Sequence, residues 1–292
     1  MADYLGRVLP VLTIVLALLV FWYGAAILMN APAQERANLR AGLGEIPFSE
    51  FVAQTWAQDK PILPAPHQVV AEVLGASFGI EPTNKRSLVY HAWITLSTTL
   101  LGFGLGTVLG IALAVFITHN DAADRSLMPW VIASQTIPIL AVAPMVVVGL
   151  GAVGLTGLVP KALTSMYLSF FPVVVGMVKG LRSPESIQLD LMRTYDANPW
   201  QVFWKLRWPA SMPILFASMK VGIAISLIGA VVAELSNVAG GGLGVRLLNG
   251  SIYGQTIQIW AALFFAAALA AVLVMIVGAA ERGINRRMGE MA

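Results

Sequence analysis

Long apolar runs are the feature of this sequence that most restricts its fold. The first run, "VLPVLTIVLALLVFWYGAAILM", extends from about Val8 to Met29, and the second from about Trp93 to Thr118. Each reaches the about 20 residues that a helix needs to cross roughly 30 Å of hydrocarbon, where only a helix satisfies every backbone amide within one segment. Further runs follow at about Leu127–Leu150, Leu155–Val178, Ile214–Leu235 and Ile257–Ala280. We therefore predict an all-α, polytopic membrane protein with about six transmembrane helices.

The residue content excludes most catalytic and metal chemistry. Only 11% of the 292 residues are charged, against roughly 25% in soluble domains. Without cysteine the chain cannot form disulfides or thiolate sites, and His67, His91 and His119 lack metal-ligand spacing. The sequence also offers no catalytic triad or carboxylate pair. We expect no catalytic residue and no metal ligand, and we expect no nucleic-acid partner because the basic residues lie beside apolar runs.

The chain divides at about residue 92. Residues 1–92 comprise the first span and an extracytoplasmic segment that is too small to fold alone, and residues 93–292 form the transmembrane core. Within the first part, Val69, Val70 and Val73 recur at helical spacing after "ILPAPH", which predicts a short surface helix. A segment at about residues 183–208 is too polar for lipid and is expected to be cytoplasmic.

The basic residues indicate that both termini are cytoplasmic. With that orientation eleven face the cytoplasm: Arg7, Arg125, Lys179, Arg182, Arg193, Lys205, Arg207, Lys220, Arg282, Arg286 and Arg287. Seven face the other side, most of them in the long loop where the rule is weak: Arg36, Arg40, Lys60, Lys85, Arg86, Lys161 and Arg246. A cleaved signal peptide ending near Ala31-Pro32-Ala33 is the alternative for the N-terminus, but its apolar run exceeds the 7–15 residues of a signal core.

Two glycine-rich motifs and one buried acid need separate interpretation. "GLGAVG", Gly149 to Gly154, lacks the strand and βαβ unit of a dinucleotide site, so it predicts a tight interhelical turn. "GFGLGTVLG" in the second span predicts close helix packing. Glu234, in "IGAVVAELSNVAGGGLG", lies deep in an apolar run. It is either a functional group of the pathway or a structural hydrogen-bond hub.

The segment "DANPWQVFWKLRWPASMP", Asp196 to Pro213, interrupts two apolar runs. Ser183-Pro184-Glu185 has the pattern of a helix start, and Asn198-Pro199 has the pattern of a second one. Pro209 and Pro213 are expected to end the second helix before the fifth span. The pattern predicts two short helices on the cytoplasmic surface, joined by a turn at Asp196-Ala197-Asn198.

These residues resemble the inner-membrane permeases of binding-protein-dependent ATP-binding-cassette importers. The family's cytoplasmic loop reads Glu-Ala-Ala, three residues, Gly, nine residues, Ile-x-Leu-Pro, and this chain keeps the spacing with Asp190-Leu191-Met192, Asp196, Leu206 and Trp208-Pro209. "TLSTTLLGFGLGTVLGIALA", "QTIPILAVAPMVVVGLG" and "VVAELSNVAGGGLG" are similar to segments of the nitrate/sulfonate/taurine branch. The resemblance covers roughly Leu63 to Arg287.

The resemblance implies a MetI-like permease in the bacterial inner membrane. Its partners would be a second permease copy, two cytoplasmic ATPases that bind ATP and Mg²⁺, and a periplasmic binding protein. The candidate ATPase-coupling residues are Asp190, Arg193, Thr194, Tyr195, Asp196, Ala197, Asn198, Trp200 and Phe203. Candidate pathway residues are Ser134, Gln135 and Thr136, beside Pro138 and Pro144, together with Glu234.

Asp196 departs from the family pattern, which has Gly at that position. Gly suits a left-handed helix end because it has no Cβ, and Asp tolerates this geometry at a cost of very roughly 1 kcal/mol. Asp196 is alternatively a cap of the second helix or a partner of a basic residue on the ATPase. We hypothesise a specialised ATPase partner.

Two other functional classes remain open from the sequence. A secondary transporter or channel would work without an ATPase, but usually has internal repeats or several intramembrane ionisable residues. A non-transporting membrane anchor would use the helix pair only for docking. The substrate is open among nitrate, sulfonates, taurine, bicarbonate and pyrimidine or vitamin precursors, and selectivity is expected to lie in the binding protein.

Overall fold

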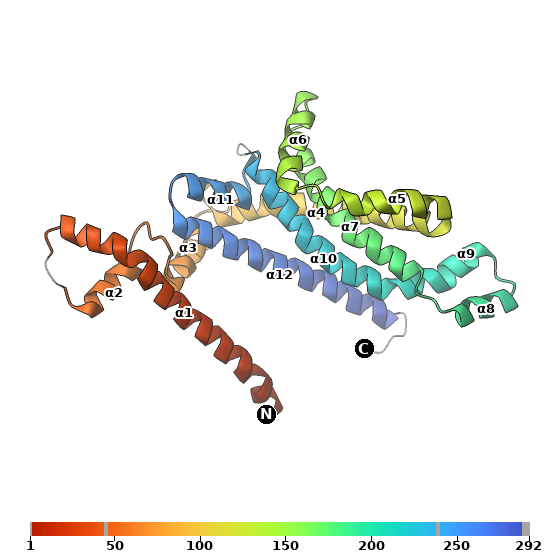
Figure 1. Cartoon of the computed structure of the whole chain (residues 1–292), viewed down its shortest axis with the longest axis horizontal. Helices are drawn as coiled ribbons and strands as arrows, with labels where there is room; N and C mark the ends of the chain where they lie inside the picture. Colours follow the sequence, from red (N-terminus) through yellow and green to blue (C-terminus); the bar gives the residue numbers. More distant parts are fainter. Residues whose placement is uncertain (1, 44–45, 238–239, 288–292) are drawn as a thin grey trace. The chain divides into compact units, whose positions relative to one another are not determined.

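The computed structural model describes residues 2–43, 46–237 and 240–287, and each regular element in these ranges is helical (Figure 1). Within these ranges, five stretches are long and apolar enough to cross a membrane: α1 (Ala2–Arg40), α4 (Leu88–His119), α7 (Leu158–Leu181), a continuous run over Pro199–Leu235, and α12 (Thr256–Arg287). A sixth apolar stretch is bent between α5 (Asp121–Ser134) and α6 (Ile139–Ala152). The predicted all-α fold with about six spans is confirmed.

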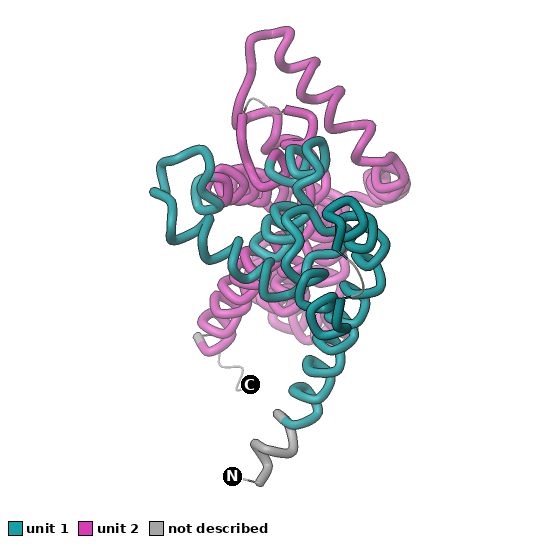
Figure 2. Tube along the Cα trace, turned by 90° about the vertical axis from the view of Figure 1, so that its left-hand side faces the viewer, with its two compact units in different colours: residues 1–90, 246–265 teal, residues 91–245, 266–292 magenta. Residues whose placement is uncertain are grey.

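Figure 2 shows the two compact units of the chain. The first comprises residues 1–90 and 246–265, and the second comprises residues 91–245 and 266–292. The division therefore passes through α4, α12 and also α11 (Leu243–Ile252). The sites described below lie in the second unit.

In the first unit, α1 continues past Met29, where the apolar run was expected to end. The buried side chain of Asn30 is a hub: its Nδ2 donates to Leu63 O (2.9 Å) and its Oδ1 accepts from the N–H groups of Ile62 (2.9 Å) and Leu63 (3.1 Å). These bonds hold the loop that leads from α2 (Phe48–Trp56) to α3 (Pro66–Phe78). The predicted short helix around Val69 is confirmed as α3.

In the second unit, small residues allow α4, α7 and α10 (Trp208–Leu235) to pack closely. A Cβ on Gly106 would lie 2.3 Å from Ser169 Oγ, and the hydroxyls of Ser165 and Ser226 are 2.6 Å apart. The packing predicted for the small residues of the second span is confirmed. The predicted tight turn after α6 is also confirmed, because Gly154 has a φ of +82°, a conformation that favours glycine.

The expected straight helix from Leu127 to Leu150 is broken, because α5 and α6 meet at 96°. Pro138 precedes α6 in an extended conformation (φ −61°, ψ 121°). A proline cannot donate a helical hydrogen bond, and it disfavours the helical conformation of the residue before it. The break leaves Gln135 and Thr136 outside both helices.

Two expectations for the cytoplasmic segment are wrong. Pro209 and Pro213 do not end a helix, since α9 (Pro199–Val202), the π-helical turn η1 (Phe203–Arg207) and α10 are continuous. The N–H of Trp208 donates to Phe203 O, and this wider turn changes the hydrogen-bond register just before Pro209. In addition, α8 (Ser186–Thr194) begins later than Ser183, because the Ser183 hydroxyl donates to Gly180 O of α7 (2.7 Å).

Candidate functional site

A helical hairpin made of α8, a four-residue connection (195–198) and α9 extends beyond the ends of α7 and α10 (Figure 1). The turn closes α8 with a Schellman motif: the N–H of Ala197 donates to Met192 O (3.1 Å) and that of Asp196 to Arg193 O (2.9 Å). Asp196 has a φ of +49°, as expected for the position where the family pattern has Gly. The backbone at Asp196 therefore adopts the left-handed turn that the sequence pattern indicated.

The start of α9 is fixed by its own cap. The Asn198 side chain accepts from the Gln201 N–H (2.9 Å), and the Gln201 side chain accepts from the Asn198 N–H (3.0 Å). This reciprocal capping satisfies two amide groups at the helix start. The second helix start predicted at Asn198-Pro199 is confirmed, and Asn198 rather than Asp196 caps it.

The hairpin has an exposed tip and a buried root. The side chains of Tyr195 and Trp200 are 77% and 69% exposed, whereas Phe203 is 7% exposed. Asp190 and Arg193 form an exposed ion pair on α8 (2.9 Å). Thr194, Asp196 and Asn198 are also exposed, and Ala197 is half-buried. Of the candidate coupling residues, Phe203 is thus buried, and its ring packs against His119 of α4 and Trp200 of α9.

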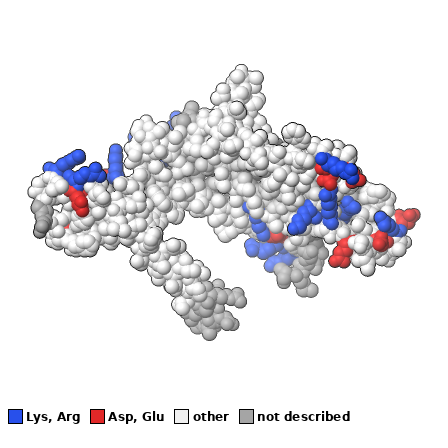
Figure 3. Space-filling view, viewed as in Figure 1, with Lys and Arg blue, Asp and Glu red and all other residues white. Residues whose placement is uncertain are grey.

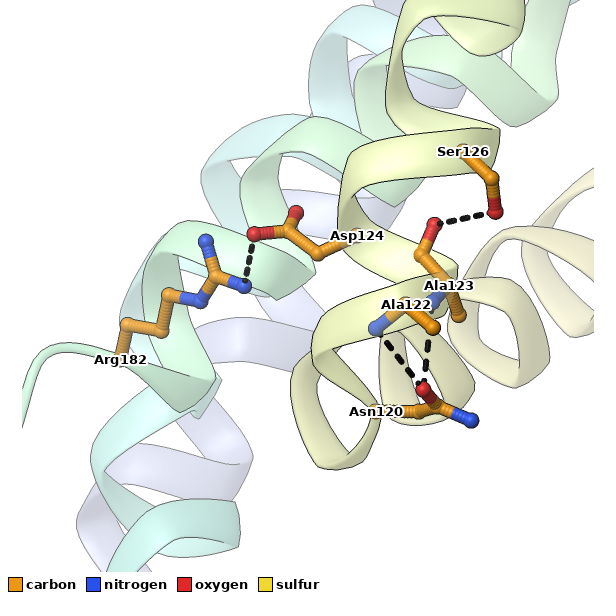
Figure 4. Close-up of polar contacts among 6 residues, drawn as sticks. All are labelled: Asn120, Ala122, Ala123, Asp124, Ser126 and Arg182. Atoms are coloured by element: carbon orange, nitrogen blue, oxygen red, sulfur yellow. Dashed lines mark hydrogen bonds and ion pairs between the residues drawn. The ribbon is translucent and has the colours of Figure 1, made fainter.

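An ion pair at the root of the hairpin joins α7 to α5 (Figure 4). Arg182, which follows α7, donates to Asp124 of α5 (2.9 Å). The side chain of Asn120 caps α5 by accepting from the N–H groups of Ala122 (3.0 Å) and Ala123 (3.2 Å). Neither the ion pair nor the cap was predicted from the sequence, although Asn120-Asp121 at the start of α5 has the pattern of a capped helix.

Charged side chains of the second unit gather at the end that carries α8 and α9 (Figure 3). A second ion pair near that end joins Lys220 of α10 to Glu281 of α12. Lys220 is one of the basic residues expected to face the cytoplasm, and Glu281 compensates its charge. Few charged side chains lie between this end and the glycine-rich loop that follows α10. A low content of charge is expected for a segment within the hydrocarbon layer, because a charged side chain is costly to place there.

The glycine-rich loop between α10 and α11 is held by four buried side chains, which we call the loop clamp: His91, Thr95, Lys161 and Glu234. They contact consecutive backbone groups of Gly241 to Gly244. Lys161 Nζ donates to Gly241 O (2.9 Å), and His91 Nδ1 accepts from the Gly242 N–H (3.0 Å). The Thr95 hydroxyl accepts from the N–H of Leu243 (2.9 Å), and Glu234 accepts from that of Gly244 (2.9 Å).

Glu234 is the centre of the loop clamp. Its side chain is fully buried, its carboxylate also accepts from the Thr95 hydroxyl (2.9 Å), and Lys161 lies close enough for charge attraction. A Cβ on Gly242 would lie 2.1 Å from the carboxyl carbon, so only glycine leaves room for the carboxylate. Of the two interpretations of Glu234, this geometry supports a structural hydrogen-bond hub. A role of Glu234 in the transport pathway stays a prediction.

The other candidate pathway residues lie at the break between α5 and α6. Ser134 ends α5, and its carbonyl accepts from the Tyr167 hydroxyl of α7. Gln135 and Thr136 follow in the break, half-buried and exposed. Glu234 bonds to Thr95 of α4 and to Gly244 of α11, whereas these three residues lie at the break between α5 and α6. In the described part of the chain no group of His, Asp and Glu is arranged to hold a metal ion.

Comparison with known proteins assigns the chain to a family. A family model described as "Binding-protein-dependent transport system inner membrane component" matches residues 106–290. The chain belongs to this family. It is a permease subunit of an ATP-binding-cassette importer, a multi-pass membrane protein without enzymatic activity of its own. The family works with an ATPase and a substrate-binding protein, and the alternative of an independent secondary transporter is not favoured.

Two relatives show how far the similarity of the permease extends. The formylaminopyrimidine transport permease protein ThiX of Halalkalibacterium halodurans is 31% identical over 59% of this chain. The riboflavin transport system permease protein RibX of Chloroflexus aurantiacus is 31% identical over 67% of it. The matches span 65% and 71% of these relatives.

A solved structure shares the fold of the permease. It is the MetNI methionine ABC transporter in an inward-facing conformation, with a TM-score of 0.55 at 21% identity over 68% of this chain and 95% of that one. At this identity the likeness shows the fold alone, and it confirms the predicted MetI-like architecture.

Proposed function

We propose that the α8–α9 hairpin is the element through which a partner ATPase drives this permease. The observation that carries the proposal is the doubly fixed turn, with a Schellman motif on one side and a reciprocal cap on the other. A turn held at both ends moves as a rigid piece when its tip is pushed. The exposed residues of the tip, including Thr194 and Tyr195, offer the contact surface.

The motion would reach the far side of the permease through one long helix. The run Pro199–Leu235 has 37 residues, which corresponds to about 55 Å at 1.5 Å per residue. It starts at the hairpin and ends beside the loop clamp. ATP and Mg²⁺ bind to the partner ATPase in this proposal, and closure of the ATPase pair rocks the helix as a rigid body. Arg182 and Asp124 carry part of the motion to α5.

Assembly and orientation complete the proposal. Two copies of the permease form the pathway, both termini are cytoplasmic, and a periplasmic binding protein delivers the substrate to the opposite face. The orientation is supported by the basic residues at the end of the second unit that carries the hairpin (Figure 3). Residues 1–92 form an additional membrane-anchored segment that precedes the core of residues 93–292, and the whole segment lies before the family match, which begins at residue 106.

For the pathway, we infer that the break between α5 and α6 contributes polar groups. Backbone that leaves a helix within the membrane is tolerated where it is buried in protein or lines a water-filled cavity, and Ser134, Gln135 and Thr136 occupy such a break. The relatives named for formylaminopyrimidine and riboflavin support a nitrogen heterocycle as the substrate class. Competition for uptake by such compounds, compared with nitrate and taurine, tests this assignment.

The experiment compares two aromatic residues of similar exposure. Tyr195→Ala alters the tip of the hairpin, whereas Phe78→Ala alters α3, where the side chain is 84% exposed. Proteoliposomes contain the permease, its ATPase and the binding protein, and both ATP-driven uptake and co-purification of the ATPase are measured. We expect Tyr195→Ala to weaken both and Phe78→Ala to leave both unchanged. Equal uptake and assembly for the two variants would refute the coupling role.

The absence of cysteine makes a second measurement direct. A cysteine placed at Thr194 is the only thiol of the permease, so it can be crosslinked to single cysteines in the ATPase. We expect a crosslink that changes in yield when ATP is bound. Uptake by the purified chain without an ATPase would overturn the importer mechanism as a whole.

A further inference from the structure

A groove in the second unit lies between the end of α4 and the hairpin. Its inner part is apolar and is lined by Val115, His119, Pro199, Trp200 and Phe203. An adjoining part is basic and shares His119 and Pro199 with the first; its other lining residues are Thr118, Leu189, Arg193, Ala197, Val202 and Arg207. The two parts therefore form one groove with an apolar end and a cationic end.

The cationic end has positive charge that the protein itself does not neutralise. Arg207 of η1 is half-buried and forms no ion pair with any residue that the structure describes. Arg193 is paired with Asp190, but the two side chains are 80% and 64% exposed, so water weakens this pair. The lining contains no Asp or Glu. A negatively charged group in the groove would thus meet two guanidinium groups from different elements.

The apolar end is built to contact hydrocarbon. Trp200 lines this end and is 69% exposed, and its ring packs edge to face on Trp204, which is 45% exposed and lies outside the lining. Tryptophans with this exposure are typical of the membrane–water interface. The His119 ring donates from Nδ1 to Val115 O (2.8 Å) and packs edge to face on Phe203, so the wall between the two ends is fixed.

We propose that this groove binds an anionic phospholipid of the cytoplasmic leaflet. The phosphate lies between Arg207 and Arg193, and an acyl chain lies along Trp200 and Val115. Basic pockets between membrane helices on the cytoplasmic side suit such headgroups. The inference rests on the orientation given under Proposed function. A lipid in this position bridges α4 and the coupling hairpin, so the lipid composition would set how firmly the hairpin is held.

The test uses quenching of tryptophan fluorescence by brominated lipid in nanodiscs that contain the full-length permease without its ATPase. Dibrominated phosphatidylglycerol supplies an anionic headgroup, and dibrominated phosphatidylcholine supplies a neutral one at the same density. We expect stronger quenching by phosphatidylglycerol and loss of this difference in Trp200→Phe. Equal quenching by the two lipids would overturn the proposal.

Two neighbouring cations provide the matched comparison. Arg207 lines the groove, whereas Lys205 lies two residues away on η1, is exposed and does not line it. Arg207→Gln should weaken the preference for phosphatidylglycerol about fivefold, which corresponds to one lost cation near a membrane surface. Lys205→Gln should change it less. A larger effect of Lys205→Gln would mean general surface attraction and would refute the site.

Soluble anions are the remaining alternative. If inorganic phosphate at millimolar concentration abolishes the difference between the two lipids, the groove is a soluble-anion site and the lipid assignment is wrong. The measurement does not depend on transport. Both leaflets of the nanodisc contain the brominated lipid, so the permease meets it in either orientation. Failure of the proposed orientation or coupling role therefore leaves the quenching difference intact, whereas failure of the lipid site removes it.

Discussion

Replacement of Glu234 should collapse the loop clamp. In Glu234→Ala, two donors lose a charged acceptor: the Thr95 hydroxyl at 2.9 Å and the Gly244 N–H at 2.9 Å. Each hydrogen bond to a charged group contributes roughly 1.5–3 kcal/mol, so the two bonds account for about 3–6 kcal/mol. The variant also leaves the buried ammonium of Lys161 without its compensating charge, which adds to the loss.

The role of charge is separated from the role of hydrogen bonding by a double-mutant cycle. Glu234→Gln keeps the shape of the side chain, and Lys161→Met keeps most of its length. Each single variant leaves one buried charge uncompensated, whereas the double variant leaves none. We expect the double variant to be less destabilised than the sum of the single variants, with an interaction energy of roughly 1–3 kcal/mol.

The assay is thermal unfolding of the purified permease in detergent, together with ATP-driven uptake. A loss of about 3 kcal/mol corresponds to a decrease in Tm of roughly 10 °C for a chain of this size class. The matched control is the ion pair between Lys220 of α10, the helix that also carries Glu234, and Glu281 of α12, whose side chains are 35% and 18% exposed. Lys220→Met and Glu281→Gln should each lower Tm less than the Glu234 and Lys161 variants do. Strictly additive effects of the Glu234 and Lys161 variants would refute the charge-compensated clamp.

Three further predictions concern other contacts. Asp196→Gly should relieve about 1 kcal/mol of strain at a positive φ and improve assembly with ATPases of related importers, whereas unchanged assembly in pull-downs would argue against a specialised partner. Arg182→Gln and Asp124→Asn break a partly exposed pair, so each should cost about 0.5–1 kcal/mol, and a cycle on Tm should show coupling. Asn30→Ala leaves the N–H groups of Ile62 and Leu63 without their acceptor and should lower the free energy of unfolding by roughly 2–4 kcal/mol. Limited proteolysis between α2 and α3 should become faster, and an unchanged cleavage rate would contradict the role of Asn30 as a hub.

The features predicted from the sequence are those that depend on nearby residues. The spans follow from runs of apolar residues, and the turn of the hairpin follows from Asp196 and the Asn198-Pro199 start of α9. In each case the physical cause lies within a few positions along the chain. A left-handed residue, a helix cap and a membrane-spanning helix are each determined by the residues of one continuous segment. These features can therefore be predicted from a single sequence.

The features that escaped prediction depend on contacts between distant segments. Thr95 and Glu234 are 139 positions apart, and no local pattern indicates that they meet. Pro209 shows the same limit in the opposite direction: a proline normally ends a helix, but the π-helical turn before it lets the helix continue. The four residues of the loop clamp meet only because α4, α7 and α10 pack together, and this packing could not be predicted from the sequence.

The long helix and the loop clamp together suggest how a continuous motion at the hairpin produces a discrete change at the far end. Side chains from three elements hold four consecutive backbone groups at the end of the loop and the start of α11: α4 contributes His91 and Thr95, α7 contributes Lys161, and α10 contributes Glu234. A shift of α10 moves Glu234 relative to the other two helices, so its bonds to Thr95 and Gly244 weaken together. Buried charges do not tolerate intermediate positions, because each unpaired group pays its full desolvation cost. The loop is therefore expected to switch between held and released states rather than to follow the helix gradually.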